Sequence, residues 1–236
     1  GGVTWQHMEV ETSYGPHIED VHFINSTTGY LCAGDDFSYD KAFIYKSTDA
    51  GNTWVRQFFQ IDSYLNSISF PEGNSDVGFA AGLSGDMYKT SNGGANWIAL
   101  KNTVTTTGFN SVHFPDANTG YAVGYGTVTK TTNGGINWVN LTHPAPSNQS
   151  EGVFFINGNT GFIGGEFNNI WKTTNGGVNW ASTQPAVFSL YHEFYFTDAN
   201  TGYAAGAQGK ISKTTNQGAT WTGQITGTTW DFRDIE

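Results

Sequence analysis

Short stretches of alternating apolar and polar residues recur along the chain, as in Ile170–Thr173, and each leads into a polar turn that ends in a tryptophan. Alternation with a period of two is typical of a half-buried β-strand. The closing tryptophans lie 43, 41, 42 and 41 residues apart, at Trp54, Trp97, Trp138, Trp180 and Trp221. A fixed spacing of this size indicates a repeat architecture.

A second motif precedes each of these turns: an apolar strand, a turn, and a strand that ends in small residues. Residues 112–124 (VHFPDANTGYAVG) are the cleanest copy, and the counterparts begin at Val21, Ile68, Val153 and Phe194. Each repeat is therefore predicted to hold four strands, A to D. In the third repeat these are residues 112–114, 121–124, 127–131 and 137–141.

Four-stranded units with this period predict an all-β fold, a β-propeller of four-stranded antiparallel blades, with a solenoid as the alternative. The 236 residues suit a single domain, 1–236, with blades at about 20–60, 66–103, 110–143, 151–184 and 192–226. Residues 1–5 resemble the end of another turn, and residues 232–236 resemble the start of another A strand. We therefore predict five complete blades, with the terminal segments 1–19 and 227–236 either reinforcing the ring seam or pairing with another molecule. The same overlap suggests a piece of a longer repeat protein.

The residues of the turns have structural explanations. A short Asp or Asn side chain can accept a hydrogen bond from a backbone N–H two residues on, and the glycine two positions later suits a left-handed backbone. Burial of each tryptophan contributes roughly 2–3 kcal/mol, with more expected if its indole N–H is bonded. The predicted structural residues are Asp49, Gly51, Trp54, Asn92, Gly94, Trp97, Asn133, Gly135, Trp138, Asn175, Gly177, Trp180, Asn216, Gly218 and Trp221.

The pattern Ser/Thr-x-Asp-x-Gly-x-Thr-Trp resembles the Asp-box of bacterial neuraminidase-type (BNR) repeat proteins. Residues 47–54 match it strictly, and the other four copies carry Asn in place of Asp. The rhythm NTGYAVG and TTNGG-Trp is also similar to that of photosystem II assembly and stability factor propellers. The resemblance implies a propeller, and the second family implies a rigid, non-catalytic platform that binds a partner.

Arginine content excludes one activity of the Asp-box families. Sialidases clamp a sugar carboxylate with a cluster of arginines, because guanidinium offers a planar bidentate fork. This chain has only Arg56 and Arg233. The sialidase clamp cannot be built, and the same shortage argues against the basic partner-binding patch of the photosystem II factors.

Net charge narrows the class of partner. The chain carries 20 acidic and 10 basic residues, a formal net charge of −10. Nucleic acid is disfavoured, because Lys and Arg must neutralise its phosphates, and no apolar stretch of about 18 residues predicts membrane insertion. The single Cys32 cannot form an intrachain disulfide, and it lies in an apolar strand where a buried, inert thiol is expected.

The propeller geometry sorts the loops onto two faces. A–B turns and boxes share one face, whereas D–A and B–C loops share the other, around the mouth of the central channel, where loops carry function. The first B–C loop is the longest, at residues 34–41. The candidate ligand-binding residues on this face are Glu19, Asp20, Asp35, Asp36, Tyr39, Asp40, Glu151, Glu166, His192 and Glu193.

We expect a secreted or cell-surface, bacterial-type module that binds a protein or glycan partner, and we predict no catalytic residue, metal ligand or cofactor. Three alternatives stay open. A glycoside hydrolase needs two carboxylates roughly 5–10 Å apart, which these loops can offer. A lectin would use the same carboxylates with exposed aromatic rings. Calcium prefers oxygen ligands such as Asp35, Asp36 and Asp40, although their spacing matches no EF-hand loop. His22 and His113 take equivalent A-strand positions and are predicted to be structural or channel-lining.

Overall fold

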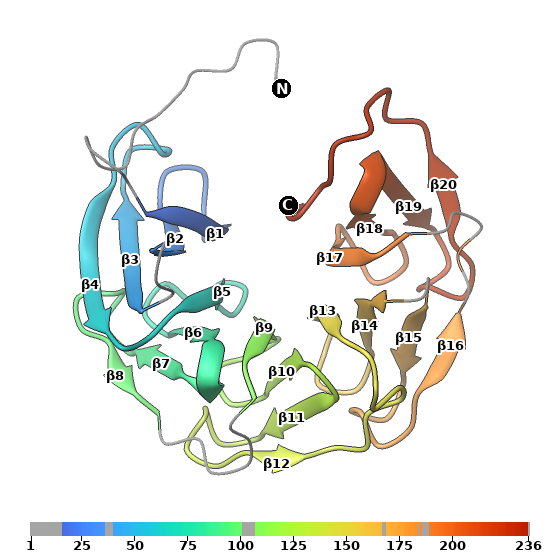
Figure 1. Cartoon of the computed structure of the whole chain (residues 1–236), viewed down its shortest axis with the longest axis horizontal. Coiled ribbons are helices and arrows are strands. Elements are labelled where there is room, and N and C mark those ends of the chain that lie inside the picture. Colours follow the sequence, from blue (N-terminus) through green and yellow to red (C-terminus); the bar gives the residue numbers. More distant parts are fainter. Residues whose placement is uncertain are drawn as a thin grey trace.

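The computed structural model describes residues 16–35, 40–100, 107–166, 169–183, 185 and 189–235. The chain forms five antiparallel sheets of four strands, each with its strands in chain order. Figure 1 shows the sheets arranged as an arc around a common centre, with β1, β5, β9, β13 and β17 innermost. The prediction of an all-β propeller with five blades is confirmed.

Every blade consists of four consecutive strands. Among the fully described elements, the short 3₁₀ turns η1 (Leu83–Gly85) and η3 (Ala207–Gly209) follow strands of blades two and five. The strands are β1 (His17–Phe23), β2 (Gly29–Gly34), β3 (Lys41–Ser47), β4 (Val55–Ile61), β5 (Leu65–Ser69), β6 (Gly78–Gly82), β7 (Met87–Thr90), β8 (Ile98–Ala99), β9 (Phe109–His113), β10 (Gly120–Gly124), β11 (Thr127–Thr131), β12 (Val139–Asn140), β13 (Ser150–Phe155), β14 (Gly161–Gly165), β15 (Ile170–Thr173), β16 (Ala181–Thr183), β17 (Tyr191–Phe196), β18 (Gly202–Gly206), β19 (Lys210–Thr214) and β20 (Thr222–Gln224). Within the described residues, no helix is long and apolar enough to span a bilayer.

The innermost strands begin earlier than their sequence pattern predicts. In blade three, strand β9 starts at Phe109, where the alternation predicts a start at residue 112. Each innermost strand has a register shift against its neighbour, for example between Leu65 and Ser67 in β5. A bulge of this kind breaks the period-two alternation. The polar residues expected in loops before these strands therefore lie within the strands.

The turn before each tryptophan is held by a side-chain network that the sequence analysis described incompletely. In box three, Thr131 Oγ1 accepts from the N–H groups of Asn133 (3.3 Å) and Gly135 (3.0 Å). Asn133 Oδ1 accepts from the N–H of Asn137 at 2.9 Å, four residues on and not two as predicted. Gly134 and Gly135 both have positive φ angles, 65° and 83°. The first polar residue of the box is therefore the main acceptor for the turn.

The tryptophans pack edge-on against phenylalanines at the end of the innermost strands or directly after it, as Trp138 does on Phe114 at 5.9 Å and 89°. The expected gain from an indole hydrogen bond does not arise at four of them. In the part of the chain that the structure describes, the buried Nε1 atoms of Trp97, Trp138, Trp180 and Trp221 have no hydrogen-bond partner. Their contribution to stability comes from packing.

Adjacent blades are joined by apolar clusters and by polar contacts between innermost strands. Four clusters of buried residues each combine two successive blades, from blades one and two to blades four and five. A fifth cluster, which includes Leu31, Phe43 and Tyr45, belongs to blade one alone. Innermost strands do not pair with each other, so side chains of one strand accept the N–H groups of the next. Ser69 Oγ accepts from Phe114, and His113 Nδ1 accepts from Phe155.

The C-terminal segment lies between the two ends of the arc and reaches the centre (Figure 1). The N–H of Phe232 donates to the carbonyl of Gly206 at 3.1 Å, and Asp231 accepts from the N–H of Gln208 at 2.7 Å. Burial raises the pKa of Asp234, against the opposing effect of backbone hydrogen bonds that include one from Val21. Residues 231–234 thus contact blade five and the innermost strand of blade one.

Candidate functional site

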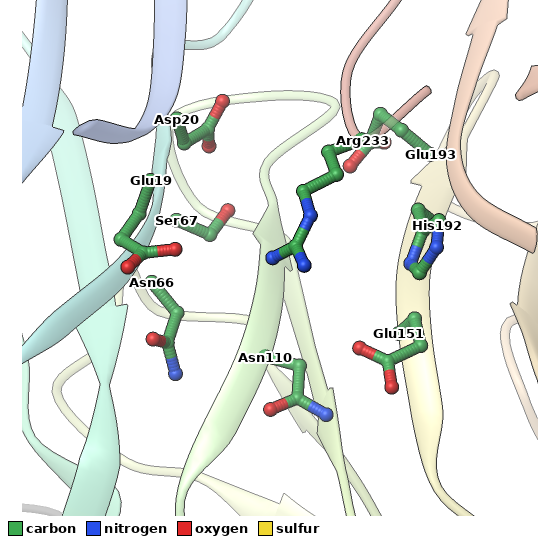
Figure 2. Close-up of a pocket in the computed structure, with 9 residues that line it drawn as sticks. All are labelled: Glu19, Asp20, Asn66, Ser67, Asn110, Glu151, His192, Glu193 and Arg233. Atoms are coloured by element: carbon green, nitrogen blue, oxygen red, sulfur yellow. The ribbon is translucent and has the colours of Figure 1, made fainter. Parts of the chain in front are cut away.

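The innermost strands of all five blades contribute polar residues to one pocket at the mouth of the central channel (Figure 2). The pocket has a volume of about 180 Å³. Its residues are Glu19 and Asp20 from β1, Asn66 and Ser67 from β5, Asn110 from β9, Glu151 from β13, His192 and Glu193 from β17, and Arg233 from the C-terminal segment. The register of the bulged strands brings equivalent positions to the channel, two adjacent residues in blades one, two and five and one residue in blades three and four. The candidates Glu19, Asp20, Glu151, His192 and Glu193 of the sequence analysis thus line one pocket, together with Asn66, Ser67 and Asn110, which were not among the candidates.

Several of these side chains connect neighbouring strands. Asp20 Oδ2 accepts from the N–H of Ile68 at 2.8 Å. The amide groups of Asn66 and Asn110 donate to the carbonyls of Phe109 (2.7 Å) and Ser150 (2.9 Å). These bonds satisfy backbone groups that no adjacent strand pairs. Asp20, Asn66 and Asn110 therefore have a structural role in addition to lining the pocket.

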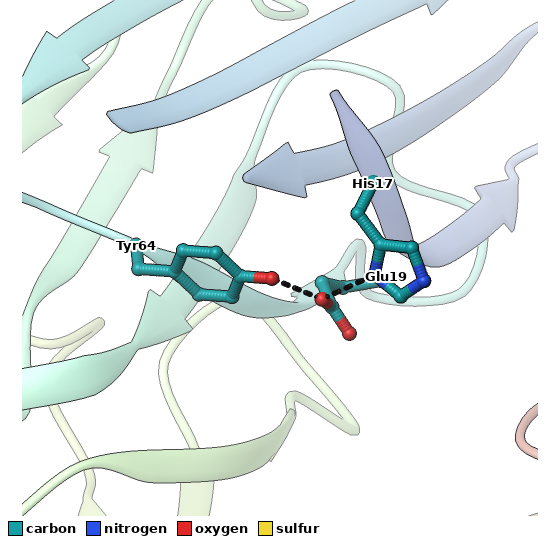
Figure 3. A network of polar contacts seen from close by, with 3 residues as sticks. All are labelled: His17, Glu19 and Tyr64. Atoms are coloured by element: carbon teal, nitrogen blue, oxygen red, sulfur yellow. Dashed lines mark hydrogen bonds and ion pairs between the residues drawn. The ribbon is translucent and has the colours of Figure 1, made fainter. Parts of the chain in front are cut away.

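Glu19 is held by two neighbours (Figure 3). Its Oε1 accepts a hydrogen bond from the hydroxyl of Tyr64, and His17 Nδ1 lies 2.8 Å from the same oxygen. Tyr64 follows β4 and approaches from blade two, so the contact also joins the first two blades. One carboxylate oxygen of Glu19 is thus fixed in place.

Glu151 differs from the other acids of the pocket, because no hydrogen bond to its carboxylate is formed within the described residues. Burial raises the pKa of Glu151, the negative charge of Glu166 raises it further, and Arg233 opposes both effects. Glu166 itself does not line the pocket, and its Oε2 accepts from the N–H of Gln149 at 3.3 Å. Glu151 is therefore the acid whose oxygens remain available to a ligand.

His192 stands beside Glu151 in Figure 2. Burial lowers the pKa of His192, and so does Arg233, while Asp231 opposes the shift. The imidazole is consequently neutral near pH 7. Its Nε2 is buried and has no hydrogen-bond partner among the residues that the structure describes.

Arg233 is the pocket residue that the sequence analysis missed. In Figure 2 its guanidinium extends into the space between Glu19 and Glu151. The sequence analysis used Arg233 only to show that the chain has too few arginines for a sialidase clamp. No local pattern around it signals a site, because it reaches the mouth only when the C-terminal segment crosses the end of the ring.

The long first B–C loop does not contribute to this pocket through its described residues. Lys41 Nζ lies 2.6 Å from Asp35 and 3.8 Å from Asp40, so a lysine neutralises these acids locally. Asp36 and Tyr39 lie outside the described residues. Among described residues there is also no group of three or more His, Cys, Asp and Glu side chains that could hold a metal ion.

A second cavity, of about 480 Å³, lies at the end of the channel near the A–B turns. His22, His113, Phe154 and Tyr195 from four innermost strands line it. Burial lowers the pKa of His22 to about 4, and burial together with the nearby His22 lowers that of His113 to about 3. Both imidazoles are therefore neutral at physiological pH, and they line the channel as structural residues.

Comparison with protein-family models and with curated protein sequences found no match. Among solved structures, the fold is similar to that described as YCF48 bound to D1 peptide (TM-score 0.61, 16% identity, 89% of this chain and 81% of that chain). It is also similar to the GH74 enzyme of Niastella koreensis (TM-score 0.68, 22% identity, 89% of this chain but 38% of that chain). The WD40 β-propeller domain of Doa1 gives a TM-score of 0.62 at 12% identity, over 86% of this chain and 66% of that chain. At these identities the likeness shows the propeller fold alone.

Proposed function

We propose that this protein is a non-catalytic binding module whose channel mouth receives a cationic side chain of a protein partner. One observation carries the proposal: Glu19, Asp20, Glu151 and Glu193, from three blades, line the same small pocket. These four carboxylates outnumber the one guanidinium of Arg233 in the pocket, and an excess of one charge at a concave site raises the local concentration of the opposite charge. The formal net charge of −10 favours the same kind of partner.

The size of the pocket limits what enters it. Small-molecule sites usually measure about 300–1,000 Å³, and this pocket measures about 180 Å³. It therefore suits one lysine or arginine side chain better than a sugar chain. The guanidinium of Arg233 extends into the pocket, which supports the view that the pocket can receive a cationic side chain. Glu151 offers a carboxylate that accepts no hydrogen bond from a described residue, and it is the residue we assign to the ligand.

The known proteins of similar fold support a binding role by analogy. YCF48 is described with a bound D1 peptide, and the Doa1 domain is a WD40 propeller. We further propose that the five boxes are divergent Asp-box repeats of the BNR type. The strict copy supports this. Ser47 accepts from the N–H of Gly51, as Thr131 accepts from Gly135 in box three. Asp49 accepts from the N–H of Thr53, as Asn133 accepts from Asn137. An extracellular or cell-surface location, expected from composition, remains part of the proposal, and cell fractionation tests it.

A glycoside hydrolase is the second candidate, and Glu151 is the observation that favours it. A carboxyl whose pKa is raised by burial can act as a general acid beside a second carboxylate. The GH74 enzyme has a similar fold, although this chain spans 38% of its length. Hydrolysis of oligosaccharide substrates, abolished in Glu151→Gln, would establish this candidate in place of the binding module.

Fluorescence anisotropy with labelled peptides tests the binding proposal. Two peptides of equal length are compared, one with lysine and arginine and one with glutamine at those positions. We expect the chain to bind only the cationic peptide, more weakly at high salt, with at least a tenfold loss of affinity in Glu151→Gln. Asp76→Asn is the matched control, since Asp76 is exposed on the face of the boxes.

Equal affinity for the two peptides, or unchanged binding in Glu151→Gln, would contradict the proposal. A glycan array run with the same variants distinguishes a glycan partner from a protein partner. Glycan binding that depends on Glu151 would replace the protein partner with a sugar and favour the lectin alternative.

A further inference from the structure

One position of each innermost strand faces the central channel in all five blades. In the register of its own sheet, this residue lies opposite an aromatic residue of the second strand. The residues at this position are His22, Ser69, His113, Phe154 and Tyr195, and all five line the channel. Four of the five blades therefore place an aromatic side chain at the same level of the channel.

These four rings line the cavity of about 480 Å³ that lies at the end of the channel near the A–B turns. All five blades contribute to this cavity, and residues 231–235 do not. Its volume falls within the usual range of small-molecule sites, about 300–1,000 Å³. The acidic pocket at the opposite mouth is smaller, at about 180 Å³. The cavity is therefore a separate site that the five blades form by themselves.

The walls of the cavity are held in place by ring contacts and by one hydrogen bond. His22 stacks on Phe70 with 6.0 Å between the ring centroids, and His113 lies 4.4 Å from Phe154. His113 Nδ1 also accepts from the N–H of Phe155 at 3.2 Å. The two imidazoles and the ring of Phe154 are thus fixed before any ligand enters.

The charged residues of the lining are acidic. Glu72 and Asp198 lie in the A–B turns of blades two and five, and both are exposed at the rim. Backbone hydrogen bonds from Asn200 and Thr201 lower the pKa of Asp198, so its carboxylate is ionised at neutral pH. Among the described residues that line the cavity there is no lysine or arginine. The cavity therefore combines aromatic walls with a negatively charged rim.

We propose that this cavity binds a small organic cation, a quaternary ammonium compound whose methyl groups pack against the aromatic rings. The face of an aromatic ring attracts a cation, and cages of such rings recognise quaternary ammonium ligands. Phe154 and Tyr195 supply such faces, and Tyr195 is 37% exposed. The carboxylates of Glu72 and Asp198 favour a ligand with net positive charge. This site is independent of the acidic mouth.

Two other kinds of ligand fit less well. A neutral apolar molecule would gain the same packing against the rings, but nothing from the carboxylates at the rim. A phosphocholine group, including that of a lipid, carries the same ammonium, but its phosphate would meet the like charges of Glu72 and Asp198. A quaternary ammonium without an acidic group matches both the walls and the rim.

Ligand-observed NMR titration of the full chain tests the proposal with choline and its neutral analogue, in which a tert-butyl group replaces the trimethylammonium group. The two probes have the same shape and differ in charge. We expect choline to bind at least fivefold more tightly than the analogue, and more tightly than phosphocholine. Tyr195→Leu should weaken choline binding at least fivefold. Tyr125→Leu is the matched control, because it removes a tyrosine that is 58% exposed in the turn between β10 and β11.

A second variant tests the acidic rim. Asp198→Asn combined with Glu72→Gln removes both charges, and the turn should be retained, because Asn157 makes the equivalent bonds in blade four. We expect choline binding to weaken at least threefold and the preference for choline over phosphocholine to disappear. Glu151→Gln, at the opposite mouth, should leave choline binding unchanged.

Equal affinity for choline and its neutral analogue would overturn the proposal, since the cavity would then recognise apolar shape alone. This comparison uses the unaltered chain, so it decides the matter even if Tyr195→Leu lowers Tm. Choline binding that is insensitive to both Tyr195→Leu and the rim variant would also overturn the proposal. A loss in Glu151→Gln alone would place the cation at the acidic mouth, against this inference but in agreement with the proposed function.

Discussion

At the scale of single residues, the boxes work through packing and through hydroxyl acceptors. The sequence analysis assigned a structural role to the tryptophan and to the Asp or Asn of each box. In the folded chain, Thr131 and its equivalents accept two N–H groups each, and in four of the boxes the tryptophan contributes buried apolar area without an indole hydrogen bond to a described residue. Acceptors this close in sequence to their donors are a local property, so a sequence pattern can predict the turn itself.

Trp138 provides a test of the packing contribution. It is 5% exposed and lies edge-on against Phe114. Trp138→Ala should lower the free energy of unfolding by about 3–5 kcal/mol, the usual cost of a large core deletion. Val139→Ala, at a position 57% exposed, should change it by no more than about 0.5 kcal/mol. Urea denaturation measures both, and an unchanged midpoint for the tryptophan variant would refute the structural role.

His113 links the channel to acid stability. Burial lowers its pKa to about 3 in the folded chain, against about 6.5 in an unfolded chain. Between these values the unfolded state binds one more proton, so stability falls as the pH falls, by about 1.4 kcal/mol per pH unit. His113→Ser removes this titration and keeps an acceptor, because Ser69 accepts from Phe114 at the equivalent position.

Denaturation midpoints from pH 7 to pH 4 provide the measurement for His113. The variant should show a shallower loss of stability on acidification than the parent chain, whatever its stability at pH 7. Parallel curves for the two proteins would show that His113 is protonated equally in the folded and unfolded states, contrary to our expectation.

At the scale of elements, the bulge in each innermost strand decides what reaches the channel. It shifts the register at positions such as Leu65 and Ser67, and it moves polar residues from expected loops into strands. The lysines of the third strands then bond to the next blade, so a blade's stability depends on its neighbour. Burial lowers the pKa of Lys130 and Lys172, which lie in two of these junctions.

The box turn gives an element-scale prediction. Thr131→Ala removes the acceptor for two N–H groups, and we expect a loss of about 1–2 kcal/mol in the free energy of unfolding, similar to the loss of a helix cap. Thr131→Ser should recover most of it, because Ser47 makes the same bonds in box one. Chemical denaturation of the three proteins decides the matter. Equal losses in both variants would assign the effect to the methyl group of the threonine.

At the scale of the whole molecule, the ring brings together acids that are far apart in sequence. Glu19 and Glu193 are separated by most of the chain and face the same pocket. The C-terminal segment adds Arg233 and bonds to blade five through Gly206. The pocket therefore depends on how the five blades are assembled, and any change that alters a junction should also alter binding at the mouth.

The pH dependence of binding belongs to this scale, because the pKa of Glu151 is set by burial and by groups from other segments. Its carboxylate must be ionised to receive a cation. Because the pKa of Glu151 is raised, its carboxylate takes up a proton at a higher pH than an ordinary glutamate does. Affinity for a cationic peptide should therefore fall on acidification before the pH reaches the usual pKa of glutamate. In the same window the folded state binds more protons than the unfolded state, so this group favours folding as the pH falls.

Glu151→Gln separates these two effects. The variant should bind the cationic peptide weakly at every pH, without the loss seen in the parent chain on acidification. Its stability at pH 7 should equal or exceed that of the parent, because a buried charge is removed. Anisotropy titrations between pH 7 and pH 4.5 test the first statement. A parent curve that is flat over this range would contradict the assignment of Glu151.

Sequence alone determined the repeat, the four strands of each blade and the positions that gather at the channel mouth. These features follow from short-range rules: alternation with period two, the left-handed glycine of each turn, and a spacing near 42 residues. The prediction was wrong where a bulge interrupts the alternation, since the pattern then ends before the strand does. The tertiary structure alone placed Arg233 among the acids and paired Asp35 with Lys41. These outcomes depend on where the ring begins and ends in space, which no local pattern of residues encodes.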